Sequence, residues 1–230
     1  MSTALVTGAG RGIGERTARR LLERGLRVLA LDKDFSRCSL PEAAARVRYD
    51  LQDLAGIARL VASLGEIKVL VNNAAVLHCD PHEAFPEAHA AEIFAVNLRA
   101  PVALIEAVAP QMRARRGGRI VNVASVAAFT GHPDLWYGAT KAALLNITKS
   151  YAGYLGRDGI LVNAVAPGPT ESAMYEQLPQ SRKDAVMRSV YSGRACTPDE
   201  VAQAIVWLAT DSPPYLSGAT LDVNNGSYPR

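Results

Sequence analysis

Three side chains that could carry out proton transfer lie within residues 118–149 of the sequence. Ser125 directly follows an apolar, β-branched run of the kind that forms a buried strand. Tyr137 and Lys141 are four residues apart in a segment with helical spacing, so both would lie on one helical face. A tyrosine has an ordinary pKa of about 10, and a nearby positive charge favours its phenolate form. These three residues form a candidate proton-transfer set, although a tyrosine and a lysine at this spacing also occur by chance on helix surfaces.

The chain opens with a strand, a glycine turn and a helix, a pattern that favours nucleotide binding. The strand is expected over Thr3–Thr7 and the helix over residues 15–24. Such a turn brings backbone N–H groups and the positive end of a helix close to a pyrophosphate. Ile13 stands where the ordinary Gly-x-Gly-x-x-Gly fingerprint has its last glycine, so the loop is a variant, and a plain tight turn is the alternative. The residues predicted to contact a cofactor here are Gly8, Arg11, Gly12, Ile13 and Gly14.

An acidic residue, Asp32, follows the second expected strand, residues 26–31, and bears on the choice of cofactor. Its carboxylate can accept hydrogen bonds from the adenine-ribose hydroxyls and would repel a 2′-phosphate, which predicts NAD over NADP. Arg11 and Lys33 could attract that phosphate instead. Asp34 is a competing candidate for the same role, and Asp32 could be a simple turn residue.

The remaining pattern alternates strands with helices, which predicts a three-layer α/β fold with a doubly wound parallel sheet and helices on both faces. Further strands are expected over residues 47–49, 69–71, 119–124, 160–165 and 219–223, and further helices over residues 54–64, 84–104, 198–208 and from Tyr137 onward. Ligands of such sheets bind at the carboxyl ends of the strands. The additional residues that we place against the cofactor are Asp50, Leu51, Asn73, Ala74, Ala75, Tyr137, Lys141, Pro167, Gly168 and Thr170. Asp50 could also serve as the N-cap of the helix expected over residues 54–64.

Two segments beside these strands are expected to shape the pocket. Residues 171–197 are irregular and polar, which favours a mobile lid, with an ordinary exposed loop and helix as the alternative. Residues 78–82, His-Cys-Asp-Pro-His, contain metal-ligand types at a spacing that matches no standard site, so we predict a polar loop and no metal. The predicted substrate pocket comprises Ser125, His132, Trp136, Tyr137, Met174 and Tyr175.

Composition supports a single domain over residues 1–230. The 49% hydrophobic and 20% charged content is typical of a soluble globular enzyme, and no linker or repeat divides the chain. No apolar run suggests a membrane span and no room remains for a signal peptide, so a cytoplasmic protein is expected. Cys38, Cys79 and Cys196 are scattered and are expected as free thiols. A net charge of +3 is too small to predict nucleic-acid binding.

Taken together, the chain resembles the short-chain dehydrogenase/reductase family over nearly its whole length. The matching motifs are Thr7-Gly8-x-x-x-Gly12-Ile13-Gly14, Asn72-Asn73-Ala74, Asn97, Ser125, Tyr137-x-x-x-Lys141 and Pro167-Gly168-x-Thr170, in the family's order. The resemblance implies a seven-stranded Rossmann fold and NAD(P)-dependent interconversion of a secondary alcohol or diol and a ketone. It also implies that Tyr137 is the general acid/base, that Lys141 lowers its pKa and holds the nicotinamide ribose, and that Ser125 orients the substrate oxygen.

The resemblance further implies that Asn97 supports a water in a proton relay and that the protein forms a homo-oligomer, a dimer or tetramer. Ala75 replaces the glycine that commonly follows Asn-Asn-Ala in the family. The loop between Ser125 and Tyr137 is one residue shorter than in many members, so the sequence does not identify the substrate. An NADP-dependent ketone reductase and a non-catalytic NAD(P)-binding redox sensor or regulatory protein are the alternatives. The intact Asn97, Ser125, Tyr137 and Lys141 argue against the sensor.

Overall fold

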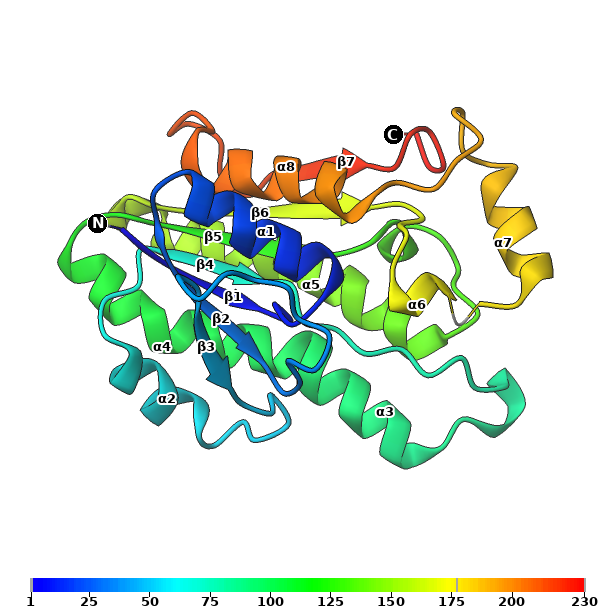
Figure 1. The fold of residues 1–230 in the computed structure, drawn as a ribbon, viewed down its shortest axis with the longest axis horizontal. Helices are drawn as coiled ribbons and strands as arrows, with labels where there is room; N and C mark the ends of the chain where they lie inside the picture. The colour runs from blue at the N-terminus through cyan, green and yellow to red at the C-terminus, as the bar shows by residue number, and fades with distance from the viewer. Residues whose placement is uncertain (1, 177, 230) are drawn as a thin grey trace.

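The structure is a computed structural model that describes residues 2–176 and 178–229, and it is built on one parallel sheet (Figure 1). The strands are β1 (Thr3–Thr7), β2 (Arg27–Asp32), β3 (Ala45–Arg48), β4 (Val69–Asn72), β5 (Gly118–Val123), β6 (Ile160–Pro167) and β7 (Thr220–Val223). They lie in the order β3-β2-β1-β4-β5-β6-β7, and every neighbouring pair is parallel. The strand order reverses between β1 and β4, which is where ligands of open α/β sheets bind. The predicted doubly wound Rossmann sheet is confirmed.

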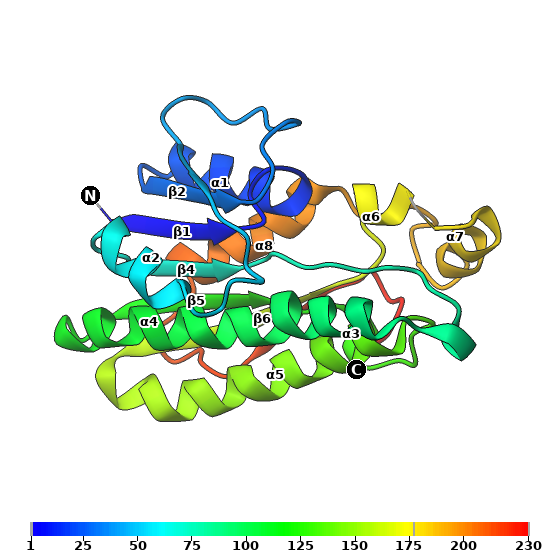
Figure 2. The same ribbon diagram turned by 90° about the horizontal axis from the view of Figure 1, so that it is seen from below.

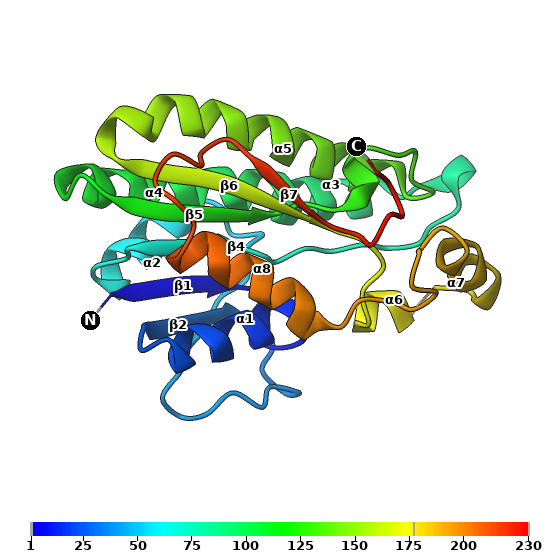
Figure 3. The ribbon, with the colours of Figure 1, turned by 90° about the horizontal axis from the view of Figure 1, so that it is seen from above.

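Helices cover both faces of the sheet and close two hydrophobic cores. α1 (Gly12–Glu23) and α8 (Pro198–Thr210) lie side by side on one face, as Figure 3 shows. α2 (Ile57–Leu64), α4 (Ala100–Ala114) and α5 (Leu135–Leu155) cover the other face, where α4 and α5 are neighbours (Figure 2). Fully buried leucine and isoleucine side chains fill both interfaces, and each such burial contributes about 1.5–3 kcal/mol.

The helix expected over residues 84–104 is a longer run with a change of pitch. A 3-10 turn, η1 (His82–Ala84), precedes α3 (Glu87–Phe94), and a π-helical turn, η2 (Ala95–Arg99), joins α3 to α4. Pro101 has no N–H to donate back to the preceding turn, so a local departure from α-helical bonding is expected beside it. The helix expected to end near residue 104 therefore contains a π turn and continues to Ala114.

This run, Glu87–Ala114, is long and apolar enough by composition to cross a membrane, with a mean hydropathy of 1.5 over eighteen residues. Half of that window is buried inside the fold. Leu104, Ile105 and Met112 are fully buried in the core between α4 and the sheet. Packing against the sheet accounts for the apolar character of the run, as it does for core helices of globular proteins.

The other element boundaries agree with the sequence within a few residues. α1 begins at Gly12 rather than residue 15, so the last glycines of the turn form its first helical turn. α8 begins after Thr197, whose hydroxyl accepts from the N–H of Glu200 while the Glu200 side chain accepts from the N–H of Thr197, and this capping box confirms the predicted cap. The segment expected as a lid contains two short helices, α6 (Ala173–Glu176) and α7 (Gln180–Met187).

Candidate active site

A cavity of about 1110 Å³ opens at the carboxyl ends of the strands and gathers most of the residues singled out from the sequence. Among those residues it is lined by Gly8, Arg11, Gly12, Ile13, Asp32, Asp50, Leu51, Asn73, Ala74, Ala75, Ser125, His132, Tyr137, Lys141, Pro167, Gly168, Thr170, Met174 and Tyr175. Gly14, Asn97 and Trp136 do not line it. The cofactor and substrate positions predicted from distant parts of the chain thus share one space.

The glycine turn after β1 is held by side chains at the ends of two strands. The hydroxyl of Thr7 accepts hydrogen bonds from the backbone N–H groups of Asn73 and Ala74, both at 3.0 Å. The amide of Asn73 donates to the carbonyl oxygens of Thr7 and Gly8 at 2.9 and 3.1 Å. Gly8 has a φ of +64°, which few other residues adopt. These bonds give the turn a defined shape beside the cavity.

Gly14 has a packing role behind this turn. A Cβ atom at Gly14 would lie 2.1 Å from the carbonyl oxygen of Gly8, so only glycine lets α1 approach the turn this closely. The structure therefore corrects the expectation of a direct cofactor contact for Gly14: its effect on a ligand is indirect, through the position of the helix N-terminus.

The carboxylate of Asp32 lies at the end of β2 and on the cavity wall. It accepts hydrogen bonds from the N–H groups of Gly10 at 2.8 Å and Asp34 at 3.0 Å, which fix its orientation. Asp34, the competing candidate, is exposed, does not line the cavity and instead accepts from Ser36. Geometry therefore places Asp32, rather than Asp34, on the cavity wall.

Asp50 lines the cavity beyond β3, but it does not cap α2. Its carboxylate accepts from the N–H of Gln52 at 3.0 Å, and the N-cap position of α2 is Gly56. Asp53 supplies the nearby side-chain acceptor, for the N–H of Gly56 at 3.1 Å. The capping role considered for Asp50 is thus wrong, and its position on the cavity wall is the one that remains.

Ser125, Tyr137 and Lys141 converge at the end of β5. Ser125 begins a short 3-10 turn, η3 (Val126–Ala128), and its hydroxyl accepts from the N–H of Ala127 at 3.2 Å. Lys141 lies one turn along α5 and donates from Nζ to the carbonyl oxygen of Val123 at 2.7 Å. The same Nζ is 5.6 Å from the centre of the Tyr137 ring. The spacing in the sequence correctly indicated one helical face for the phenol and the amine.

Burial changes the proton affinities of both groups. Burial raises the pKa of Tyr137, the hydrogen bond from Ser125 opposes this rise, and the negative charge of Asp134 adds to it. Burial alone lowers the pKa of Lys141 to about 7. Contrary to the expected direction, the pKa of Tyr137 is raised, because desolvation outweighs any effect of the Lys141 charge in this structure.

The orientation of α5, which carries Tyr137 and Lys141, depends on Asp134, which was not among the residues predicted from the sequence. Asp134 is buried, forms the N-cap of α5 and accepts from the N–H of Tyr137 at 2.9 Å. It also accepts from the backbone N–H of His78 at 3.4 Å. An aspartate just before a helical pattern is an N-cap signal, so its position in the sequence could have indicated this role.

Asn97 lies in the π turn and is fully buried outside the cavity. Its side chain accepts from the N–H of Val76 at 2.8 Å and donates to the carbonyl oxygen of Val76 at 3.0 Å. This pairing holds the loop after β4 against the helix. The Asn97 side chain thus positions a loop that lines the cavity.

The loop before α5 and the segment of α6 and α7 form another part of the cavity wall. The ring of His132 lies 5.1 Å from that of Tyr137, and Arg182 of α7 donates to Nε2 of His132 at 2.8 Å. Burial lowers the pKa of His132. Since a guanidinium can only donate, His132 accepts through Nε2 and is neutral in this arrangement.

Trp136, predicted for the substrate pocket, faces elsewhere. Its ring packs against that of Phe94 on α3, with 5.4 Å between ring centroids. Successive residues of an α-helix are about 100° apart, so a helix that turns Tyr137 toward the cavity turns Trp136 away from it. Trp136 is therefore an interhelical contact in this structure.

The buried amine leads to a prediction about stability and pH. Because the pKa of Lys141 is about 7 in the folded protein and 10.5 as its ordinary value, the unfolded chain binds more protons between these pH values. The destabilisation is fully present below pH 7 and disappears as the pH rises through 10.5. Lys141→Met should therefore unfold at higher denaturant concentration than the wild type near pH 7, by a few kcal/mol, and the difference should shrink toward pH 10.

Lys149→Met is the matched control, because Lys149 is an exposed lysine on the same helix. Its effect on the free energy of unfolding should not vary with pH in this way. A stability difference between wild type and Lys141→Met that stays constant from neutral to alkaline pH would contradict the assignment.

Comparisons with known proteins agree with this geometry. The family model described as enoyl-(acyl carrier protein) reductase matches residues 8–227. Galactitol 2-dehydrogenase of Agrobacterium fabrum is 36% identical, over 98% of this chain and 96% of its own length. The 3-oxoacyl-[acyl-carrier-protein] reductase FabG of Staphylococcus epidermidis is 33% identical, over 98% of both chains.

Solved structures give the same result. One described as a short chain dehydrogenase/reductase family protein is 35% identical, covers 99% of this chain and 97% of its own, and has a TM-score of 0.91. A Beutenbergia cavernae protein, provisionally described as an NAD(P)-dependent gluconate 5-dehydrogenase and holding NADP at low occupancy, is 32% identical, covers 98% of this chain and 96% of its own, and has a TM-score of 0.91. The chain therefore belongs to the short-chain dehydrogenase/reductase family and is an oxidoreductase acting on CH–OH groups.

Proposed function

We propose that this protein is an NAD-dependent dehydrogenase that interconverts a secondary alcohol or diol and its ketone. The observation that carries the proposal is a single cavity that contains Ser125, Tyr137 and Lys141 at one end and the glycine turn with Asp32 at the other. A dinucleotide spanning this space would bring its nicotinamide to the tyrosine. Relatives named for galactitol and gluconate favour polyols and sugar acids as first substrates to test, beside the 3-oxoacyl thioesters of the reductase relatives.

The residues present fit a dinucleotide. Gly14 allows the close approach of helix and turn that a pyrophosphate site requires, since an added Cβ atom would lie 2.1 Å from the carbonyl oxygen of Gly8. Gly8 lets the turn pass close to the loop after β4, where an added Cβ atom would lie 2.8 Å from the Cα of Ala74. The N-terminus of α1, which begins at Gly12, opens on the cavity and favours an anion. When bound, the nicotinamide ring would supply the hydride acceptor or donor of the reaction.

In the oxidation direction, Tyr137 would take the proton of the substrate hydroxyl as hydride leaves the same carbon. The hydroxyl of Ser125, which lines the cavity together with Tyr137, would hold the substrate oxygen beside the phenol. An ammonium at Lys141 would favour the phenolate, and the pKa near 7 lets this residue gain or lose a proton near neutral pH. Asp134 and Asn97 would act by holding the helix and the loop in register.

The role of Tyr137 is tested by Tyr137→Phe, with Tyr151→Phe as the control on the same helix. The hydroxyl of Tyr151 reaches Glu106, outside the cavity. Turnover, followed by NADH absorbance on a panel of polyols, sugar acids and 3-oxoacyl thioesters, should fall about 100- to 10,000-fold in Tyr137→Phe, because it removes the group that exchanges the proton. Tyr151→Phe should turn over substrate like the wild type.

NADH binding, measured by fluorescence, should be retained by both tyrosine variants. An unchanged rate in Tyr137→Phe would refute the catalytic role. If the wild type bound NADH but turned over no member of the panel, the sensor alternative would take precedence.

We further propose that NAD is preferred because the Asp32 carboxylate meets the adenine ribose. Lys33, which could attract a 2′-phosphate, is paired with Glu92 at 3.5 Å, whereas Arg11 and Arg37 also line the cavity. Asp32→Asn keeps a carbonyl acceptor for the N–H of Gly10 but removes the negative charge. The ratio of kcat/KM for NAD over that for NADP should fall at least about ten-fold in this variant, equivalent to about 1.4 kcal/mol.

The matched control is Asp34→Asn, because Asp34 lies two residues away and outside the cavity wall. It should leave the cofactor ratio unchanged. A wild-type enzyme that prefers NADP would mean that Arg11 and its neighbouring cations outweigh Asp32.

Residues 171–197 are proposed as a lid over the substrate end. The two ends of the segment are hydrogen-bonded to each other. The N–H of Glu171 donates to the carbonyl oxygen of Cys196 at 2.9 Å, and the N–H of Cys196 donates to the carbonyl oxygen of Pro169 at 2.8 Å. Between these ends, the contact of Arg182 with His132 holds the segment against the loop that precedes α5. A segment tied at its base and held at its tip by a hydrogen bond can open without disturbing the sheet.

Arg182→Ala should therefore make the lid more susceptible to chymotrypsin, which cuts at neither arginine nor alanine. Loss of one hydrogen bond of about 1 kcal/mol should increase the cleavage rate within the lid about five-fold, and cofactor with substrate should slow cleavage of the wild type. Arg188→Ala, an exposed change on the same segment, is the control. A cleavage rate that changes neither with Arg182→Ala nor with ligands would show a passive loop.

A further inference from the structure

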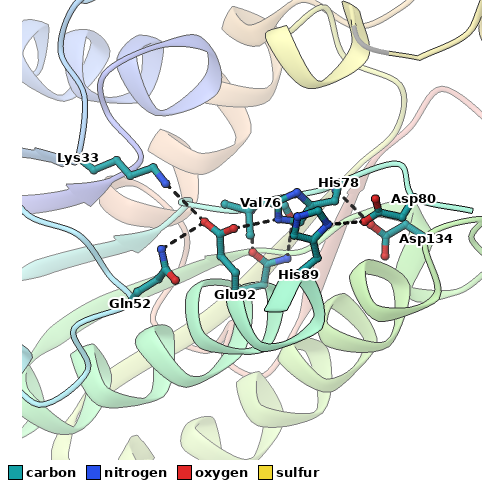
Figure 4. A network of polar contacts seen from close by, with 9 residues as sticks. Lys33, Gln52, Val76, His78, Asp80, His89, Glu92 and Asp134 are labelled. Carbon is teal, nitrogen blue, oxygen red and sulfur yellow. Dashed lines mark hydrogen bonds and ion pairs between the residues drawn. The ribbon is translucent and has the colours of Figure 1, made fainter. Parts of the chain in front are cut away.

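Two histidines and two carboxylates meet beside the cavity and have no part in the proposed reaction (Figure 4). His78 and Asp80 belong to the loop after β4, and His89 and Glu92 lie one turn apart on α3. His78 and Glu92 line the cavity, so the group forms part of its wall. The side chains are partly buried, with exposed fractions of 24% for His78, 19% for Asp80 and 38% for His89.

The polar atoms of this group are close enough to share an ion. One ligand atom from each of His78, Asp80 and His89 lies within 4.8 Å of the others. The two imidazole rings are stacked, with centroids 3.8 Å apart and planes inclined by 8°. Nδ1 of His89 is 2.7 Å from the Asp80 carboxylate, and Nε2 of His78 is 2.9 Å from that of Glu92.

These contacts define which ring nitrogens are available. A neutral histidine that donates one N–H to a carboxylate keeps a lone pair on its other nitrogen. His78 therefore presents Nδ1, whereas Nδ1 of His89 and the Asp80 carboxylate share one hydrogen, which an ion bound by both atoms would displace. Histidines that bind metals commonly have a carboxylate on the opposite ring nitrogen, which is the position of Glu92 relative to His78.

We propose that His78, Asp80 and His89 bind one divalent transition-metal ion, of which Zn²⁺ is the reference, with Glu92 as the supporting carboxylate. Two imidazoles and one carboxylate suit this class, whereas Mg²⁺ and Ca²⁺ select oxygen ligands. The rings must turn out of their parallel stack, because each lone pair lies in the plane of its ring. Torsions about the bond to an imidazole are broad and these side chains are partly exposed, so the chain can accommodate this movement.

The site replaces the sequence-based expectation that the His78 region holds no metal. That expectation considered residues 78–82 alone, whose spacing fits no standard site. The structure adds His89, eleven residues after His78, because α3 folds back along the loop. The proposal does not depend on the reaction or its substrate, since it rests on side chains outside the proton-transfer set.

The site is tested on untagged protein that has been stripped with a chelator. Titration with Co²⁺, followed by visible absorption, and with Zn²⁺, followed by calorimetry, should reveal about one equivalent of bound ion. His89→Gln and Asp80→Asn should each weaken binding at least ten-fold, and Glu92→Gln should weaken it about ten-fold. His132→Gln and Asp184→Asn change the same residue types elsewhere and should bind like the wild type.

A second measurement guards against variants that fail to fold. Zn²⁺ should raise the thermal unfolding temperature of the wild type and of the two controls, because a ligand that binds the folded state stabilises it. It should leave the unfolding temperature of folded His89→Gln unchanged. Absence of stoichiometric binding by the wild type, or binding that persists in His89→Gln and Asp80→Asn, would overturn the proposal.

Discussion

The constraint on which this site depends is the burial of the Lys141 amine. Its side chain is 2% exposed, donates to a carbonyl at the end of β5 and has its pKa lowered to about 7 by the loss of water. An isolated charge in such a position costs several kcal/mol, and proteins reduce this cost by partial neutralisation and by hydrogen bonds. The apolar packing of α5 against the sheet, with Leu144 and Leu145 buried, must offset what remains. A proton that Lys141 releases near neutral pH is thus a consequence of the fold.

Hydrogen bonds also offset the cost of burying polar side chains near the ends of β4 and β5. Asn122 of β5 accepts from the amide of Asn72 on β4 at 2.8 Å and donates to Thr148 of α5 at 2.9 Å, all in the buried core. Each such bond contributes only about 0.5–1.5 kcal/mol net, but an unsatisfied partner costs about 1–3 kcal/mol. These bonds therefore act mainly by fixing how α5 aligns with β4 and β5, because a shifted alignment would leave the buried groups unpaired. They hold α5, and with it Tyr137, at a defined height above β4 and β5.

The sheet, the helices and the gathering of the candidate residues at one site could be predicted from the sequence. They follow from local patterns and from the rule that parallel strands bring their carboxyl ends to one edge of the sheet. The direction in which the pKa of Tyr137 shifts could not be predicted, because its burial is set by residues far apart in the chain. Trp136 was misplaced because adjacent helical residues face different directions. Asp134 carried an N-cap signal in the sequence, whereas its bond to the His78 backbone came only with the tertiary structure.

The loop after β4 is where these separate constraints meet. Asn73 ties the start of the loop to the glycine turn, and Asn97 ties its middle to the π turn through Val76. Asp134 ties its far part to α5 through the backbone of His78. Three elements thus determine the shape of one loop, and that loop lines both ends of the cavity. A shift of the π turn or of the start of α5 would therefore move a loop that also lines the cavity. The segment of α6 and α7 contacts the cavity wall at His132 through Arg182, so the shape of the cavity can vary there without moving the shared loop.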